Sequence, residues 1–442
     1  MPFRIALPPL LLAVLLALPA RADYLPRNIY LYDVSLEEFP ITALTRMEDS
    51  VESLWTQSGN AGFDPFLYYW GDFLASPVGG KTPAASWMQL LIFGGEFDLE
   101  KIAGWSGGSL FVSAVDAAGS NLSLDIGNLF TVSQAYVMNT FSLYDLYFKQ
   151  RWLDDKLEFR IGRMSAGQYF ATLPAMGLVV SGAVNGNPTS LFVNAPFHST
   201  ASASWAAYAK FRPLDQFYFD AGIFQASPRT GNPAYHGADF SIRSDDGILL
   251  MSEAGWTPVF GAEPKAGSAG KKSASANPGL PGIYTFGGYY SRYTFEKFAG
   301  GTERNACGFY GLAQQMIWRN PLNENNNLSL WAGLTYSPQQ SFALMPLMGM
   351  GGVIWQGFIP KRDSDSTLFS VYSGGFSRDY SATQVSAGAG RATAETVLEW
   401  SYIIQLTKNV QLQPDLQYII RPSGLGSIPN ALVVGFQVSA LF

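Results

Sequence analysis

The sequence contains little cysteine, histidine or charge. The single cysteine, Cys307, allows no intramolecular disulfide, which excludes a small secreted domain held together by bridges. With only His198 and His236 beside it, a zinc site built mainly from Cys and His is disfavoured, and we expect no metal or cofactor. Charged residues make up 14% of the chain, about half of what is usual in soluble proteins. The net charge of −6 argues against a nucleic-acid partner.

Long apolar runs are also missing. Beyond residue 22 no segment has 18 consecutive apolar residues, so transmembrane helices are excluded. Aromatic residues nevertheless reach 14%, and there are 45 glycines. Only helices and closed β-barrels satisfy every backbone group inside lipid. The composition therefore favours a membrane barrel, with a secreted, soluble β-rich protein as the alternative at this point.

The first 22 residues predict a cleaved signal peptide. Arg4 provides a positive start, 5–18 is an apolar run, and the Ala-Arg-Ala motif at 20–22 offers a cleavage site before Asp23. The alternative is an uncleaved anchor. It is the weaker one, because the run is shorter than the roughly 20 residues that a helix needs to cross a bilayer.

The end of the chain alternates between apolar and polar side chains with a period of two. In 431–442 the apolar face comprises Leu432, Val434, Phe436, Val438, Ala440 and Phe442. The two preceding segments, 393–407 and 410–421, alternate in the same way. Strands that face lipid on one side and water on the other require this pattern. An aromatic last residue on the lipid face is typical of outer-membrane barrels, whose insertion machinery recognises it, so Phe442 favours the barrel over the soluble alternative.

Sixteen such segments can be marked, an even number as in bacterial single-chain barrels. They are 65–78, 86–99, 107–116, 131–151, 156–163, 203–212, 216–225, 247–257, 282–294, 307–319, 326–337, 349–360, 366–377, 393–407, 410–421 and 431–442. We therefore predict an all-β, transmembrane antiparallel barrel at 65–442, after a signal peptide at 1–22 and an N-terminal segment at 23–64. Helical spacing at 45–57 predicts a short helix in that segment, either periplasmic or plugging the pore.

Two connections are unusually long. Residues 258–281 are of low complexity and predict a surface loop. Residues 164–202 instead carry many apolar side chains among Gly, Asn and Pro, which is unusual for a loop in water. A loop folded into the barrel against its wall would bury them, so we expect an inward-folded loop that narrows the lumen.

Alternation assigns candidate pore-lining residues on two neighbouring segments. Leu157, Phe159 and Ile161 should face lipid, which places Glu158 and Arg160 inside the lumen. On the preceding segment Tyr144, Leu146, Phe148 and Trp152 should face lipid, and the inward candidates are Asp145, Tyr147, Lys149 and Arg151. These charges either contact a solute or merely neutralise one another along a polar wall.

Arg163 is out of register with Arg160 and stands where the long loop begins. It is expected either to project toward the constriction, which we favour, or to cap the backbone of the loop.

Several stretches, taken in their order and spacing, resemble the carbohydrate-selective porin family of the OprB type along nearly all of the chain after the signal peptide. They are GWSGG at 104–108, GSNLS at 119–123, IGNLF at 126–130, LEFRIGR at 157–163, AG at 166–167, GNP at 186–188, LQPDLQYII at 412–420 and NAL at 430–432. The resemblance implies a 16-stranded barrel in the outer membrane of a Gram-negative bacterium, with a constricted pore that admits monosaccharides such as glucose.

The chain departs from the family at two places. Gln168 and Tyr169 stand where acidic residues are common, and Asn185 stands where a cysteine is common. Loss of an acidic group from the constriction would keep the pore and change which sugar it prefers. A sugar pore needs hydrogen-bonding groups and flat aromatic faces, and it must bind weakly enough to release the solute. Arginine suits the first need because its rigid fork donates to two adjacent hydroxyls.

Other functions remain as alternatives. A general diffusion porin, or an uptake barrel for another small nutrient, would have the same fold. An outer-membrane hydrolase is disfavoured and we expect no catalytic residues, because His198 and His236 both lie in loop-like sequence rather than on an alternating segment. A purely structural or adhesive barrel is also disfavoured. We expect sugars, outer-membrane lipids and, through Phe442, the insertion machinery as partners; the sequence leaves homo-oligomerisation open.

Overall fold

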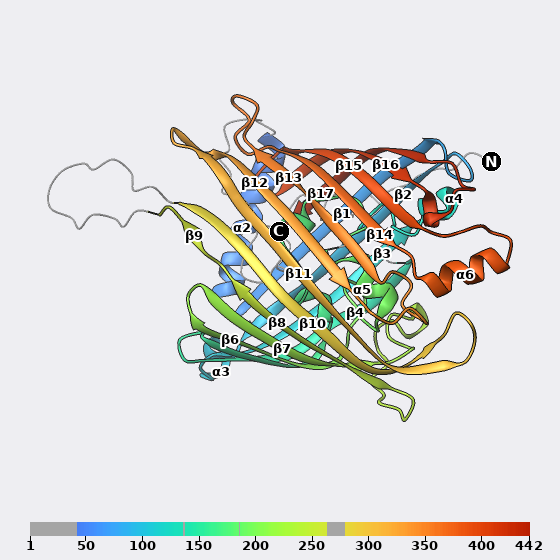
Figure 1. The fold of residues 1–442 in the computed structure, drawn as a ribbon. Helices are drawn as coiled ribbons and strands as arrows, with labels where there is room; N and C mark the ends of the chain where they lie inside the picture. The colour runs from blue at the N-terminus through green and yellow to red at the C-terminus, as the bar shows by residue number, and fades with distance from the viewer. Residues whose placement is uncertain (1–41, 136–137, 185, 263–278) are drawn as a thin grey trace, which may run out of the picture.

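The computed structural model describes residues 42–442 except 136–137, 185 and 263–278, so the expected signal peptide lies outside the described residues. Within the described part, one antiparallel sheet closes into a barrel, because β1 pairs with both β2 and β17 (Figure 1). The strands are β1 (Phe63–Val78), β2 (Ala84–Asp98), β3 (Gly108–Gly119), β4 (Thr140–Trp152), β5 (Leu157–Met164), β6 (Ser204–Leu214), β7 (Phe217–Ala226), β8 (Gly247–Trp256), β9 (Val259–Phe260), β10 (Leu280–Glu296), β11 (Thr302–Asn320), β12 (Asn323–Tyr336), β13 (Leu347–Gln356), β14 (Ser366–Gly375), β15 (Ala394–Gln405), β16 (Val410–Ile420) and β17 (Ala431–Leu441).

Sixteen of these strands form the wall, and the two-residue β9 pairs with the start of β10. The predicted fold class is therefore confirmed. Closure removes the unpaired backbone groups that an edge strand would expose to lipid.

One longer helix precedes β1, and short helices occupy several connections. They are α2 (Thr42–Asn60), α3 (Leu99–Ala103), α4 (Leu122–Ile126), η2 (Ala166–Gln168), η3 (Pro174–Gly177), α5 (Thr189–Asn194), η4 (Pro233–Tyr235), α6 (Arg378–Ser386) and η5 (Pro422–Gly424). In the part of the chain that the structure covers, no helix has the length and apolarity to cross a membrane.

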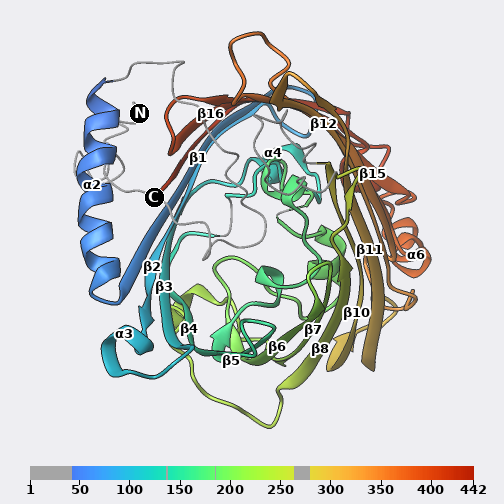
Figure 2. The same cartoon turned by 90° about the vertical axis from the view of Figure 1, so that its left-hand side faces the viewer.

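The predicted N-terminal helix at 45–57 lies within α2. Figure 2 shows α2 beside β1, outside the lumen. Glu52 forms an ion pair with Lys408 at 2.5 Å, and the Thr407 hydroxyl donates to Glu48, so the turn between β15 and β16 holds the helix at this end of the barrel.

One predicted strand, 131–151, is wrong in its first part. The strand β4 begins only at Thr140, and residues 131–135 belong to a connection that enters the lumen. Phe130 and Val132 are buried and alternate as strand residues do, which explains the error. Their backbone groups, however, bond to side chains of the wall: the Phe130 N–H donates to Glu395, and Gln417 donates to the Val132 carbonyl.

The lipid-facing assignment of Tyr144 is also wrong. The pairing of β3 with β4 shifts between Val112 and Ala114, so that β4 contains one extra residue there. Both Tyr144 and Asp145 are buried: the Tyr144 hydroxyl lies 2.9 Å from that of Ser165, and the Ser113 hydroxyl donates to Asp145. A bulge reverses the alternation on one side of it, and simple period-two counting misses this reversal.

Phe442 follows the outward alternation of β17 but does not lie open to lipid. Its side chain is 1% exposed and packs in a small cluster with Leu67, Tyr69, Val410 and Ala440. The backbone N–H of Phe442 donates to the carbonyl of Leu67 at 2.9 Å, and the reverse bond is 2.8 Å. Phe442 therefore helps to join β17 to β1, and the prediction that it contacts lipid is corrected.

Lysine substitutions on β17 test its two faces. Phe436 lies in the middle of the strand and is 38% exposed, whereas Gln437 is buried and donates to Asp72 at 2.9 Å. We expect Phe436→Lys to destabilise the barrel by about 2–4 kcal/mol in urea unfolding from lipid vesicles, because it places a charge against hydrocarbon. Gln437→Lys should be tolerated, since Asp72 can pair with the new cation. Equal losses from both substitutions would show that the faces are misassigned.

Candidate functional site

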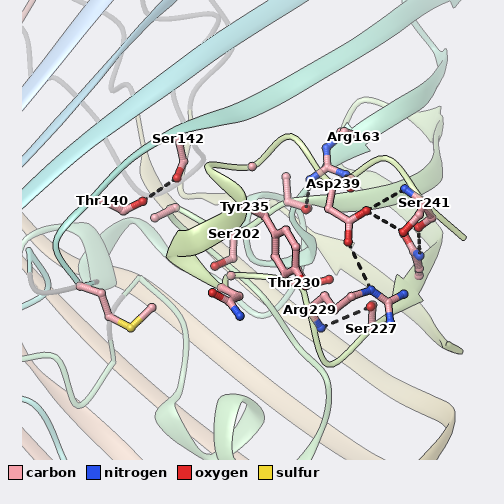
Figure 3. A pocket seen from close by; sticks show the side chains of 17 residues that line it. Thr140, Ser142, Arg163, Ser202, Ser227, Arg229, Thr230, Tyr235, Asp239 and Ser241 are labelled. Atoms are coloured by element: carbon pink, nitrogen blue, oxygen red, sulfur yellow. Dashed lines mark hydrogen bonds and ion pairs between the residues drawn. The ribbon is translucent and has the colours of Figure 1, made fainter. Parts of the chain in front are cut away.

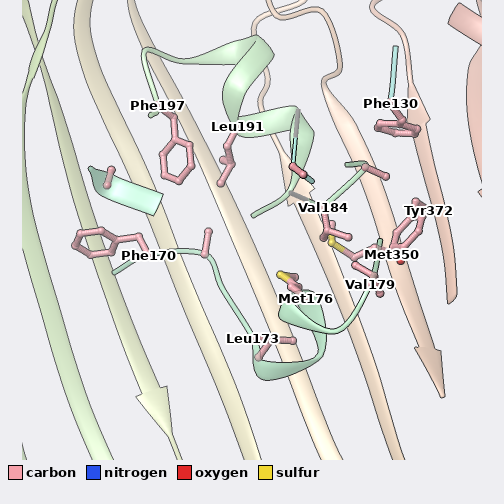
Figure 4. Packing of buried hydrophobic residues seen from close by; sticks show 14 of the residues in the cluster. Phe130, Phe170, Leu173, Met176, Val179, Val184, Leu191, Phe197, Met350 and Tyr372 are labelled. Atoms are coloured by element: carbon pink, nitrogen blue, oxygen red, sulfur yellow. The ribbon is translucent and has the colours of Figure 1, made fainter. Parts of the chain in front are cut away.

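The connection between β5 and β6, residues 165–203, folds into the barrel and is called the inward loop below. Its apolar side chains are buried against one another and against the wall, as Figure 4 shows for Phe170, Leu173, Met176 and Leu191. The prediction that this stretch folds inward against the wall is confirmed. Burial of these side chains, which favours folding by about 25 cal/mol per Å² of apolar surface, is possible only inside the barrel.

Carboxylates on the wall hold the backbone of the inward loop. The N–H of Ala171 donates to Glu253 of β8 at 3.0 Å, and those of Val180 and Ser181 donate to Glu399 of β15 at 2.7 and 3.2 Å. Each carboxylate also accepts from tyrosine hydroxyls of the wall: Glu253 from Tyr218 and Tyr310, and Glu399 from Tyr372. These charge-assisted bonds satisfy backbone donors that the loop itself leaves unpaired.

The side chain of Asn187 links distant parts of the inward loop by hydrogen bonds. Its side-chain nitrogen donates to the carbonyls of Gly167, Phe170 and Ala171 at 2.9–3.2 Å, and the residue is fully buried. This asparagine lies in the GNP motif at 186–188, for which the sequence analysis assigned no role.

Residues 129–135, in the connection between β3 and β4, also enter the lumen. Glu395 of β15 accepts the N–H groups of Leu129 and Phe130, and the N–H of Gln134 donates to Val180 in the inward loop at 2.9 Å. The two connections therefore support one another across the lumen. Period-two alternation predicts a strand from residue 131, and for that reason this second segment inside the lumen could not be expected from the sequence.

Arg160 of β5 projects into the lumen, as alternation predicted. Its guanidinium forms an ion pair with Glu158 at 2.7 Å and donates to the hydroxyls of Tyr147 and Tyr169, both at 3.1 Å. The rings of Tyr147, Tyr169 and Tyr208 lie within 5.8 Å of its central carbon. The Tyr169 and Tyr208 rings stack at 4.5 Å. The structure thus brings together three of the predicted residues with two tyrosines that the sequence analysis did not select.

Tyr169 reaches Arg160 from the inward loop. Burial raises the pKa of Tyr169 to about 12, so its hydroxyl keeps its proton at neutral pH and can donate as well as accept. Arg160 consequently meets the inward loop through a neutral hydroxyl, and its nearest carboxylate is Glu158 on its own strand.

Two further predicted residues lie near this cluster. Lys149 of β4 forms a buried ion pair with Glu96 of β2 at 2.7 Å. Asp145 accepts from Gln168 of the inward loop and from Ser113, both at 2.9 Å. Each charge on this part of the wall thus has a partner, as the polar-wall alternative also expects.

Arg163 and Arg151 lie elsewhere. The Arg163 guanidinium donates to the carbonyls of Asp239 and Ala203 at 2.7 and 2.8 Å, so it caps loop backbone, the second of its two alternatives (Figure 3). It lines a polar pocket beneath the 227–246 loop, where Arg229 forms ion pairs with Asp239, Asp245 and Asp246. Arg151 is exposed at the end of β4 and pairs with Asp155 of the adjoining turn at 3.6 Å. The structure therefore does not place Arg151 in the cluster.

A row of aromatic rings runs along the wall from β1 toward Arg160. Successive ring centroids lie 5.6 Å apart from Trp70 to Tyr68, 5.6 Å from Tyr68 to Phe66, 5.4 Å from Phe66 to Phe111 and 5.0 Å from Phe111 to Tyr147. Their alternate positions on β1, at 66, 68 and 70, are a period-two signal that a sequence search for inward aromatics could have found. Across the described residues no group of His, Cys, Asp or Glu side chains is arranged to hold a metal.

Asn187→Ala tests whether the inward loop sets the pore. The change leaves three buried carbonyls without their donor, at a cost of about 1–3 kcal/mol for each unsatisfied group, so the loop should loosen while the wall stays closed. We expect larger and noisier single-channel conductance in planar bilayers, with normal heat-modifiable gel mobility.

The matched control is Asn326→Ala on β12, which removes an acceptor of Trp355 and touches no part of the inward loop. Unchanged conductance in Asn187→Ala, or the same increase in the control, would contradict the assignment.

Comparison with known proteins extends these observations. A family model described as "Carbohydrate-selective porin, OprB family" matches residues 83–442. Porin B of Pseudomonas aeruginosa is 25% identical over 423 residues, covering 86% of this chain and 88% of the relative. The putative porin QuiX of Acinetobacter baylyi is 22% identical over 386 residues, covering 80% and 82%.

Solved structures show the same fold. The high-pH structure of Pseudomonas putida OprB matches with a TM-score of 0.79 at 22% identity, over 93% of this chain and 100% of that one. Its low-pH structure matches with a TM-score of 0.57 at 19% identity over the same shares. Since the family model spans the barrel from the start of β2 to Phe442, the chain belongs to the carbohydrate-selective porin family of the OprB type, and is a sugar-selective channel of the Gram-negative outer membrane.

Proposed function

We propose that this channel passes monosaccharides such as glucose by passive diffusion, through a weak site at Arg160. The observation that carries the proposal is the environment of the Arg160 guanidinium, which is fixed by Glu158 and two tyrosine hydroxyls and surrounded by three tyrosine rings. The inward loop supplies one of these tyrosines, which ties the site to the constriction.

The chemistry of this cluster suits a sugar. The guanidinium has a planar fork of donors for adjacent hydroxyls, Glu158 adds acceptors, and tyrosine rings offer flat faces to the apolar side of a pyranose. Each group also has a protein partner already, so a sugar exchanges bonds rather than adding many new ones. Exchange keeps binding weak, which a channel needs for release.

Charge pairing favours a neutral solute. Arg160 and Lys149 each have a carboxylate at 2.7 Å, so the cluster presents little net charge to a passing ion. An unpaired cation at the constriction would instead favour anions. This pairing supports a neutral sugar over a charged nutrient or a purely general diffusion pore.

Gln168 and Tyr169, which stand where the family commonly has acidic residues, belong to the same site. Gln168 donates to Asp145, and Tyr169 gives Arg160 a hydroxyl where the family commonly has acidic residues. A carboxylate at 169 would compete with the solute for the guanidinium more strongly than a phenol does. We therefore place sugar preference, rather than pore formation, under the control of this position.

The remaining predicted residues receive other roles in the proposal. Arg163 acts by holding the loops at 203 and 239 and not by touching the sugar, and Arg151 stabilises the turn after β4. Phe442 remains the proposed signal for the insertion machinery, recognised before β17 closes onto β1. Homo-oligomerisation and the contacts with individual lipids also remain proposals.

We propose further that the barrel has no hydrolytic activity. His198 and His236 both lie in connections rather than on strands of the wall. Neither is positioned as a base beside a serine on the rigid wall, which acyl transfer would need.

Arg160→Ala tests the site in planar bilayers. Wild-type current should be partly blocked by millimolar glucose. Loss of a guanidinium that bonds the sugar should remove roughly 1–3 kcal/mol of binding, so the variant should need about 5- to 150-fold more glucose for the same block, at unchanged conductance.

Two controls make the result specific. Arg160→Lys keeps the charge without the fork and should recover only part of the affinity, and Arg243→Ala removes an exposed arginine of the 227–246 loop and should change nothing. A wild-type current indifferent to every sugar would establish the general-porin alternative. Sugar block that Arg160→Ala leaves intact would keep the selective pore and reject the site.

A further inference from the structure

A second polar pocket lies where the aromatic row ends at Trp70, between the inward loop and the wall. It is lined by side chains of β1, β15, β16 and β17 and by Gly177 and Leu178 of the inward loop. The pocket and the open solvent at its mouth together hold about 560 Å³ of empty space. Its enclosed part has a volume of about 40 Å³, room for about three water molecules, so a sugar would present one edge of its ring to the pocket and keep the rest in the lumen.

The strand register builds one face of this pocket. Gln405 stands opposite Gln411, Gln411 opposite Ser439, and Ser439 opposite Trp70, so four strands present these residues in one straight row. Gln411 donates to Gln405 at 2.8 Å and accepts from the Ser439 hydroxyl at 3.3 Å. A neighbouring row adds Gln413 and Gln437.

The lining is amide-rich and uncharged. None of the described residues that line the pocket is an acid or a base. Amides offer donors and acceptors together, which matches sugar hydroxyls, and a pocket without charge gives no advantage to an ion. Trp70 lies nearly parallel to Tyr68, at 8° between the ring planes, and adds an apolar aromatic surface.

Tyr68 is an independent sign that the pocket takes a polar ligand. The residue is 2% exposed, and its hydroxyl has no hydrogen-bond partner among the described residues. A buried hydroxyl without a partner costs free energy, on the order of 1–3 kcal/mol. A water or solute hydroxyl in the pocket that Tyr68 lines would remove this cost.

The pocket lies toward the end of the barrel that carries the turn at 406–409, opposite the end at which the connections after β3, β5 and β7 leave the wall. Gln405 and Gln411 flank the short turn at 406–409, and short turns mark the periplasmic end of such barrels. Gln413 donates to the Leu178 carbonyl at 2.7 Å, which fixes the inward loop over this face. A sugar that has passed the loop would therefore meet this surface next.

From these observations we propose that Trp70, Gln405, Gln411 and Ser439 form a second subsite for neutral monosaccharides, on the periplasmic side of the inward loop. The inference rests on the proposed sugar passage and adds a second site to it. Two weak sites in series let a solute step between them, which keeps transfer fast without tight binding at either one. The aromatic row from Trp70 to Tyr147 connects this subsite with Arg160.

Single-channel recording with glucose added to one side at a time tests the subsite. Trp70→Leu removes the aromatic face, and Gln411→Leu removes the central amide at similar volume. Each should lower the association rate of glucose from the periplasmic side by about 3- to 10-fold, as loss of one hydrogen bond or ring contact predicts. Entry from the other side should change less than twofold, and conductance should be preserved. Trp318→Leu, an exposed tryptophan of β11 on the outer wall, is the matched control and should leave both rates unchanged.

The outcomes separate this inference from the proposed function. If Trp70→Leu and Gln411→Leu both keep the wild-type association rate of glucose from the periplasmic side, the subsite is overturned and the Arg160 site stands. Block by gluconate as strong as by glucose from the periplasmic side would overturn its preference for neutral sugars. If the wild-type current ignores glucose from both sides, the proposed function fails first and the subsite with it.

Discussion

The need to pair every backbone polar group away from bulk water governs this structure. In the wall, β1 and β17 meet this need by closing the sheet, with Phe442 and Leu67 exchanging the last pair of bonds. Inside the barrel the two connections that enter the lumen have little regular structure of their own. Glu253, Glu395 and Glu399 accept their N–H groups instead, and Asn187 serves three carbonyls of the inward loop. The wall carboxylates therefore fix the irregular inward loop in one position inside the barrel.

This use of the carboxylates shapes what a solute meets. Glu253 and Glu399 accept from tyrosine hydroxyls of the wall as well as from the inward loop, and Glu395 accepts three backbone N–H groups, so each of these glutamates already has several donors. The groups that face the path are the paired Arg160 cluster on β5 and the neutral amides beside Trp70. A lumen rich in hydrogen-bonding groups but poor in unpaired charge is the physical basis for preferring neutral sugars to ions.

The wall could be predicted from the sequence because its strands face two solvents. Lipid outside and water inside impose period two, and that period placed Glu158, Arg160, Tyr147 and Lys149 in the lumen correctly. The prediction was wrong where one extra residue changes the parity, at Tyr144, and where a lumen connection alternates like a strand, at 131–139.

The site itself was only half predictable. Tyr169 and Tyr208 join Arg160 from the inward loop and from β6, and no local pattern tells which loop residue will meet which wall residue. The favoured position of Arg163 failed for the same reason, since its carbonyl partners at 203 and 239 come from separate loops. Phe442 followed the alternation, but its burial depends on Leu67 and Tyr69 of β1, a strand that meets β17 only when the barrel closes.

Selectivity for neutral sugars is the central claim, and liposome swelling with the wild-type protein tests it most directly. Proteoliposomes would be diluted into isotonic glucose, gluconate or an amino acid smaller than glucose, and the swelling rates compared. Paired charges and neutral amides along the path predict that glucose enters fastest, ahead of the charged acid of similar size and of the smaller amino acid. Rates that follow solute size alone would contradict the account, because a water-filled pore without sugar sites sorts solutes in that way.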